Sequence, residues 1–146
     1  MSASEDFLSV SEERAIVDAI QQAEKNTSGE IRVHLEDHSE KPPLERAQEV
    51  FLALGMDKTA ASNGVLFYVG VADHHFAILG DKGINDVVAP NFWDTTKDIV
   101  IDNFKKGRHK EGLVKGILKA GEELKKYFPY DAETDEDELS NEISRG

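Results

Sequence analysis

The sequence contains no cysteine. Disulfides, thiolate nucleophiles and cysteine-ligated zinc are therefore excluded, and the composition fits a reducing compartment. It also has no run of about 20 apolar residues that could span a bilayer. Its first residues, Met-Ser-Ala-Ser-Glu-Asp-Phe-Leu, include no basic signal-peptide region. From these absences we expect a soluble, cytoplasmic protein without direct membrane insertion.

Basic residues are few beside the acidic ones. The sequence has 17 Lys and Arg residues and 29 Asp and Glu residues, which gives a formal net charge of −12. Residues 129–146 carry −6 of that charge, so the rest of the chain is acidic as well. Phosphate binding requires a cationic face, and we therefore expect no nucleic-acid partner. Divalent cations and basic proteins fit this charge.

The apolar residues form patterns that predict a single α/β domain within the 146 residues. Residues 65–71 are apolar at nearly every position, which predicts a central strand covered on both faces. Residues 30–36 alternate between polar and apolar, which predicts a half-exposed strand nearer the sheet edge. The short turn at residues 72–75 predicts an antiparallel hairpin with residues 76–79.

Segments whose apolar residues have the spacing of amphipathic helices precede and follow these strands. Ser9 and Glu12 have capping-box spacing at the start of a first helix, and Pro43 begins a second helix that ends near Gly55. Two more helices follow from residue 91, and Gly116 and Gly121 in the last of them suggest close packing against the sheet. We predict a three-layer α/β/α sandwich with a small mixed sheet, built from a βαβ unit plus a hairpin. The expected divisions are an N-terminal extension (1–8), the α/β domain (9–128) and an acidic, disordered tail (129–146).

An ordered series of short motifs resembles the TPM domain family over about residues 9–128. The series consists of Ser-Gly-Glu-Ile-Arg-Val from Ser28, Asn-Gly-Val-Leu from Asn63, Phe-Ala-Ile-Leu-Gly-Asp-Lys-Gly-Ile from Phe76 and Phe-Lys-Lys-Gly from Phe104. The resemblance implies an α/β/α sandwich, as the pattern does. It also implies acid phosphatase activity, described for plant members, and binding of calcium or another divalent cation through acidic loop residues. Some bacterial members sit beside membrane proteins of the LemA type, which makes such a protein the expected partner.

One pole of the predicted sheet gathers acidic and amide side chains. Hard cations prefer several oxygen ligands, so we predict a Ca²⁺ or Mg²⁺ site from Asp57, Asp81 and Asp94, with support from Asn63. The alternative is that these residues are solvated loop acids and turn formers. No motif for a nucleotide or organic cofactor is present, because the Gly80–Gly83 stretch is too short for a phosphate-binding loop.

Two other sets of polar residues also contain the residue types that bind metal ions. The opposite pole carries Asp and His residues of the types that bind zinc or nickel, but a solvated turn is the alternative: Asp37, His38, Asp73, His74 and His75. The tail places Asp131, Glu133, Asp135 and Glu142 at the spacing of a calcium loop, although Glu136 occupies the position that needs glycine.

The sequence therefore predicts a TPM-type domain that binds a divalent cation and acts as an accessory or quality-control module. One alternative is an acid phosphatase that uses the bound metal to activate water. Another is a non-catalytic interaction module that uses the acidic tail or the sheet edge. No residue can be assigned as a catalytic nucleophile.

Overall fold

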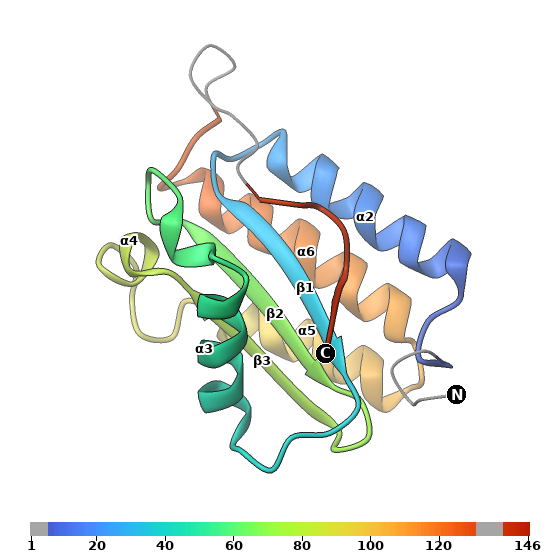
Figure 1. Ribbon diagram of the computed structural model, residues 1–146. Coiled ribbons are helices and arrows are strands. Elements are labelled where there is room, and N and C mark those ends of the chain that lie inside the picture. The colour runs from blue at the N-terminus through green and yellow to red at the C-terminus, as the bar shows by residue number, and fades with distance from the viewer. Residues whose placement is uncertain (1–5, 131–138) are drawn as a thin grey trace.

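A computed structural model describes residues 6–130 and 139–146. One four-stranded sheet, in the order β3-β2-β1-β4, lies between helices on its two faces (Figure 1). The elements are α2 (Val10–Glu24), β1 (Glu30–Glu36), α3 (Pro43–Ala53), the 3₁₀ helix η1 (Met56–Lys58), β2 (Gly64–Gly70), β3 (His75–Gly80), α4 (Lys82–Asn85), α5 (Asp94–Lys105), α6 (His109–Lys125) and β4 (Ser144–Arg145). Strands β1 and β2 are parallel and β2 and β3 antiparallel, which confirms the predicted mixed sheet with a βαβ unit and a hairpin.

The central strand β2 separates two hydrophobic cores. Val65, Phe67 and Val69 point into the larger core, which α2, α5 and α6 cover. Leu66 and Tyr68 point the other way, into a smaller core beneath α3. Every residue of β2 is buried, as expected for a strand that has helices on both faces. The predicted three-layer α/β/α arrangement is therefore confirmed.

Strand β1 is more deeply buried than its alternating pattern predicts. Ile31, Val33 and Leu35 enter the larger core, but Glu30, His34 and Glu36 on the other face are buried as well. The prediction of a half-exposed strand is wrong because α3 and residues 139–146 cover this polar face. Its acidic and imidazole groups therefore need partners within the protein.

The end of the chain also differs from the disordered tail expected from residue 129. Strand β4 pairs in parallel with β1, and Gly146 N donates to Leu35 O at 3.0 Å. Leu139 packs on the smaller core and Ile143 on the larger one, so these two apolar residues anchor the segment. Figure 1 shows it crossing the sheet beside β1. Most of the acidic run, with Asp131, Glu133 and Asp135 of the calcium-loop spacing, lies outside the described residues.

Two glycines allow the last long helix to pack closely. A Cβ on Gly116 would lie 2.4 Å from Val100 Cγ2 of α5 and 3.2 Å from Phe67 Cε2 of β2, which confirms the predicted approach to the sheet. Gly121 packs instead against Ala23 of α2, where an added Cβ would lie 2.9 Å from the alanine Cβ. No helix among the described residues combines the length and the apolar character needed to cross a membrane.

Candidate functional site

A small hollow between α3 and the end of β3 brings two of the predicted metal ligands together. Asp57 of η1 and Asp81 after β3 both line it, and its volume is about 260 Å³. Asp81 Oδ1 accepts a hydrogen bond from Lys82 N at 2.7 Å, which caps the short helix α4. Its second oxygen, Oδ2, is buried and has no hydrogen-bond partner. We call this the acidic hollow; its other lining residues are Gln48, Phe51, Leu52, Leu79 and Gly80.

Gly83 holds the acid-bearing turn against the loop that precedes β2. A Cβ at this position would lie 2.5 Å from the carbonyl oxygens of both Ala61 and Ser62. Only glycine permits this approach, because the atoms that a side chain would meet belong to the backbone. The contact fixes where Asp81 lies relative to the chain that follows Asp57.

The other two predicted ligands do not line the acidic hollow. Asn63 is buried, where its side-chain amide donates to Ser28 Oγ at 3.2 Å and its backbone N–H donates to Thr59 Oγ1 at 3.4 Å. Asp94 is exposed at the first residue of α5. Among residues 6–130 and 139–146, no three His, Asp or Glu side chains are grouped as a metal site would need. The structure thus brings two of the four predicted residues to one place.

At the opposite pole, His38 and Asp73 form a pair. His38 Nδ1 lies 2.6 Å from Asp73 Oδ1, and Ser39 N donates to Asp73 Oδ2 at 2.9 Å. The hydrogen bond between the two side chains raises the pKa of His38 and lowers the pKa of Asp73. Both oxygens of Asp73 are therefore used in holding the loop against the hairpin turn.

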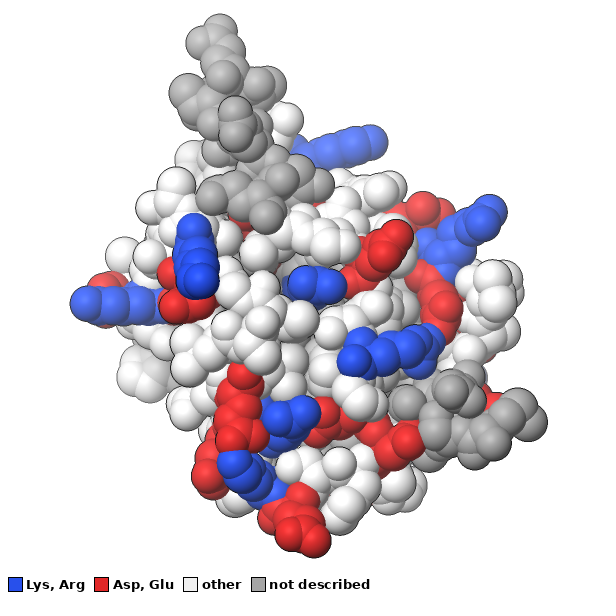
Figure 2. Space-filling model, in the orientation of Figure 1, with Lys and Arg blue, Asp and Glu red and all other residues white. Residues whose placement is uncertain are grey.

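A buried polar cluster on β1 was not predicted from the sequence. Glu36, whose side chain is 4% exposed, accepts hydrogen bonds from Arg46 Nε at 2.9 Å and Arg46 Nη2 at 2.9 Å. Tyr68 Oη donates to Glu36 Oε2 at 2.5 Å, and His34 Nε2 lies 3.0 Å from Glu36 Oε1. Strand β1 supplies His34 and Glu36, β2 supplies Tyr68 and α3 supplies Arg46. Figure 2 shows the face that carries α3, where acidic and basic side chains are interspersed.

The C-terminal segment completes this cluster. Ser144 Oγ lies 3.0 Å from His34 Nδ1, so a serine, a histidine and a carboxylate are hydrogen-bonded in series. Catalytic triads share this connectivity. Here the backbone of Gly146 covers the pair, because a Cβ on this residue would lie 2.6 Å from Glu36 Oε1 and 2.8 Å from His34 Nε2. We therefore assign the series a structural role, in which it fastens residues 144–146 to the sheet.

Burial and hydrogen bonding set the charge state of the cluster. Burial alone raises the pKa of the Glu36 carboxyl, but hydrogen bonds from Arg46, Tyr68 and His34 outweigh it and lower that pKa to about 2. Burial also lowers the pKa of His34, although the bond to Glu36 opposes this shift. Burial and the bond to Glu36 both raise the pKa of the Tyr68 hydroxyl. The stable state therefore pairs an ionised Glu36 with a neutral His34.

These shifts predict a loss of stability in acid. The pKa of Glu36 is lower in the folded than in the unfolded protein, so its contribution is complete above about pH 4.5 and is lost as the pH falls toward 2. That contribution is about 3 kcal/mol for a shift of this size. The lowered pKa of His34 acts in the same direction below pH 6.5. Urea unfolding from pH 7 to pH 3 should show a steeper decline for the wild type than for Glu36→Gln, and parallel curves would contradict the assignment.

Two sequence signals could have identified the cluster. His34 and Glu36 are two residues apart on a strand, so they share a face, and Tyr68 interrupts an apolar strand with a hydroxyl that needs a partner. Whether that face meets solvent or protein depends on α3 and residues 139–146, which strand periodicity does not reveal.

Comparisons with known proteins point to one family and one fold. The family profile described as "TPM domain" matches residues 1–123. The NMR structure of the BA42 protein from the psychrophilic bacterium Bizionia argentinensis is 59% identical, with a TM-score of 0.91 and 96% of each chain covered. A comparison with curated proteins returned no match.

Two more distant solution structures share the fold. The N-terminal domain of a protein from P. gingivalis is 18% identical, with a TM-score of 0.68, and the match covers 84% of this chain and 79% of that one. The N-terminal domain of the cg2496 protein from Corynebacterium glutamicum is 12% identical, with a TM-score of 0.62 and coverages of 93% and 79%. At these identities the likeness concerns the fold alone.

Proposed function

This chain belongs to the TPM domain family, and on that premise we propose that it binds a divalent cation in the acidic hollow and acts as an accessory or quality-control module. The observation that carries the proposal is the second carboxylate oxygen of Asp81, which is buried without a hydrogen-bond partner beside a hollow that Asp57 also lines. A buried carboxylate oxygen without a partner is costly, and a bound cation would satisfy it.

The chemistry of the hollow favours Ca²⁺ or Mg²⁺ over softer metals. Asp57 and Asp81 offer carboxylate oxygens, and Gln48 offers an amide oxygen. These are hard ligands, and the sequence contains no cysteine to select a thiophilic metal. With so few protein ligands, water would complete the coordination shell, so we expect weak binding, with a dissociation constant of roughly 0.1–1 mM.

Calorimetric titration with Ca²⁺ and Mg²⁺ tests this proposal. We expect Asp81→Asn and Asp57→Asn each to abolish the binding heat, because each removes one formal charge from the hollow. Asparagine can still cap α4 at position 81, so the fold should be preserved. Asp98→Asn is the matched control, since it makes the same charge change at an exposed position of α5.

The outcomes separate a specific site from a general effect of the negative charge. Loss of binding in both hollow variants, with unchanged binding in Asp98→Asn, would support the site. Equal effects in all three variants would show that the net charge of −12 attracts the cation without a defined site. An absence of heat in the wild type at millimolar metal would overturn the proposal.

The finer alternatives remain predictions. The phosphatase activity implied by the resemblance would need the same cation to polarise a phosphate ester, so it depends on the outcome above. The LemA-type membrane partner and the interaction through the acidic tail or sheet edge likewise remain predictions.

A further inference from the structure

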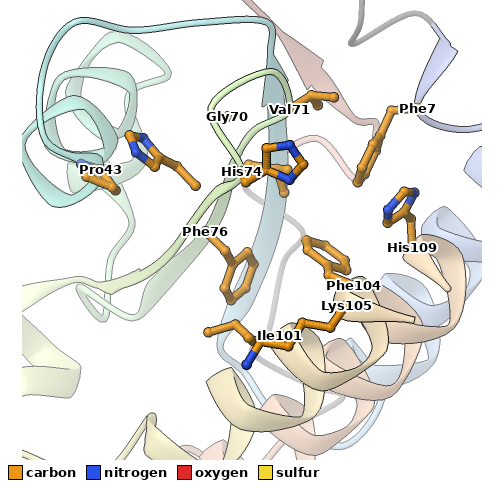
Figure 3. Close-up of a pocket in the computed structure, with 12 residues that line it drawn as sticks. Phe7, Pro43, Gly70, Val71, His74, Phe76, Ile101, Phe104, Lys105 and His109 are labelled. Carbon is orange, nitrogen blue, oxygen red and sulfur yellow. The ribbon is translucent and has the colours of Figure 1, made fainter. Parts of the chain in front are cut away.

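A second pocket lies between the β2–β3 hairpin and helices α5 and α6. Its lining residues differ in kind from those of the acidic hollow. Its volume is about 560 Å³, within the range of small-molecule sites. Aromatic and aliphatic side chains form most of its wall: Phe7, Val69, Val71, Phe76, Ile101 and Phe104. The rings of Phe76 and Phe104 meet edge to face at 5.7 Å, and Phe104 meets Phe7 in the same way at the same distance. We call this the aromatic pocket (Figure 3).

The aromatic pocket is lined by several basic side chains. Three of the five histidines in the sequence line it, together with Lys105, and no Asp or Glu among residues 6–130 and 139–146 does. In Figure 3, His74 and His109 lie on one side of Phe76 and Phe104, and the side chain of Lys105 extends beside Ile101 on the other side. Among the described residues, the ionisable side chains that line this pocket are therefore bases, in a chain with a net charge of −12.

One ring nitrogen among these bases has no hydrogen-bond partner in the part of the protein that the structure describes. The Nδ1 atom of His75 is buried and lacks a hydrogen-bond partner. His74 adopts a positive φ of 56° in the β2–β3 hairpin turn, a conformation in which histidine is enriched. The nearby carboxylate of Asp73 holds His38 and Ser39 through hydrogen bonds and also interacts electrostatically with His75.

We infer that the aromatic pocket binds a small amphipathic carboxylate, such as a medium-chain fatty acid. The aliphatic chain occupies the space between Phe76, Ile101 and Phe104. The carboxylate faces Lys105 beside Ile101, and this lysine supplies a positive charge and N–H donors. The burial of the chain provides most of the affinity, and Lys105 selects an anionic head group. This inference is independent of the cation site, which lies in a different hollow with different residues.

Titration of the protein with sodium octanoate, followed by ¹H–¹⁵N NMR, tests the inference. We expect chemical-shift changes at residues 69–76 and 101–109 and little change at Asp57 or Asp81. Because 1-octanol has the same chain without the charge, it should bind more weakly. Lys105→Met keeps the length and removes the charge, and it should weaken octanoate binding about tenfold while leaving octanol binding unchanged. Lys106→Met is the matched control, since this neighbouring lysine does not line the aromatic pocket.

A second variant tests whether the ligands occupy the aromatic pocket. Ile101→Trp should fill the pocket and abolish binding of both ligands, and a well-dispersed spectrum would show that this partly exposed position tolerates the change. The inference is overturned if octanoate leaves the residues of the pocket unshifted at millimolar concentration. Equal weakening by Lys105→Met and Lys106→Met would also overturn it, since the attraction would then be nonspecific.

Discussion

Replacing Arg46 with methionine is expected to lower the free energy of unfolding by about 3 kcal/mol, near the lower end of the range for breaking a buried ion pair. The guanidinium donates twice to Glu36, whose side chain is 4% exposed. Methionine preserves much of the aliphatic packing but leaves a buried carboxylate without its cation. Urea unfolding at pH 7, monitored by circular dichroism, measures the loss.

Two companion variants identify the cause of that loss. Adding Glu36→Gln to Arg46→Met should restore part of the stability, because it removes the unpaired charge while Tyr68 keeps a hydrogen-bond partner. Glu49→Gln removes the exposed carboxylate that pairs with both Arg46 and Lys41, and it should change the free energy of unfolding very little. If Glu49→Gln and Arg46→Met had equal effects, the stabilising interaction would lie on the surface of α3 and not in the cluster.

The second large effect is expected at Gly116, where Gly116→Ala should destabilise the protein by about 2 kcal/mol. Alanine is the better helix former by about 1 kcal/mol, so an exposed site would gain stability from this change. Here the new Cβ would lie 2.4 Å from Val100 Cγ2 and 3.2 Å from Phe67 Cε2, between fully buried side chains. Overpacking of this kind typically costs about 1–3 kcal/mol, and sometimes more, so it outweighs the gain in propensity.

A rescue experiment isolates the contact. Val100→Ala alone creates a cavity and should destabilise the protein. Combined with Gly116→Ala, it removes the atom that the new methyl group meets, so the double variant should be more stable than the sum of the single effects predicts. Additive effects would show that the two positions do not contact each other. The measurement is again the midpoint of urea unfolding, with unchanged slope as the check that the folded state remains compact.

The structure also separates the two binding proposals in space and in chemistry. The acidic hollow offers carboxylates at the end of β3, and the aromatic pocket offers Lys105 of α5 beside an apolar wall. A divalent cation and an amphipathic carboxylate therefore have opposite charge requirements. Octanoate should bind equally well to Asp81→Asn and to the wild type, because the substitution lies outside the aromatic pocket.

Local sequence patterns determined most of the framework of this protein. The apolar run of β2, the capping box of α2, the proline at the start of α3 and the short hairpin turn each act within a few neighbouring residues. Their signals can therefore be read from spacing alone. The direction of the predicted strands determines which loops lie at the same end of the sheet. This direction was sufficient to place Asp57 and Asp81 at one pole.

The tertiary structure decided which polar residues are buried and which acids share a hollow. Residues 144–145 pair with β1 more than a hundred positions away in sequence, and this pairing encloses His34 and Glu36. Arg46 and Tyr68 reach the same carboxylate from a helix and a different strand. Asn63 and Asp94 do not line the acidic hollow, since Asn63 is buried with its amide bonded to Ser28 and Asp94 begins α5. Such contacts depend on how segments distant in sequence pack together. Side-chain periodicity is a local property and does not predict that packing.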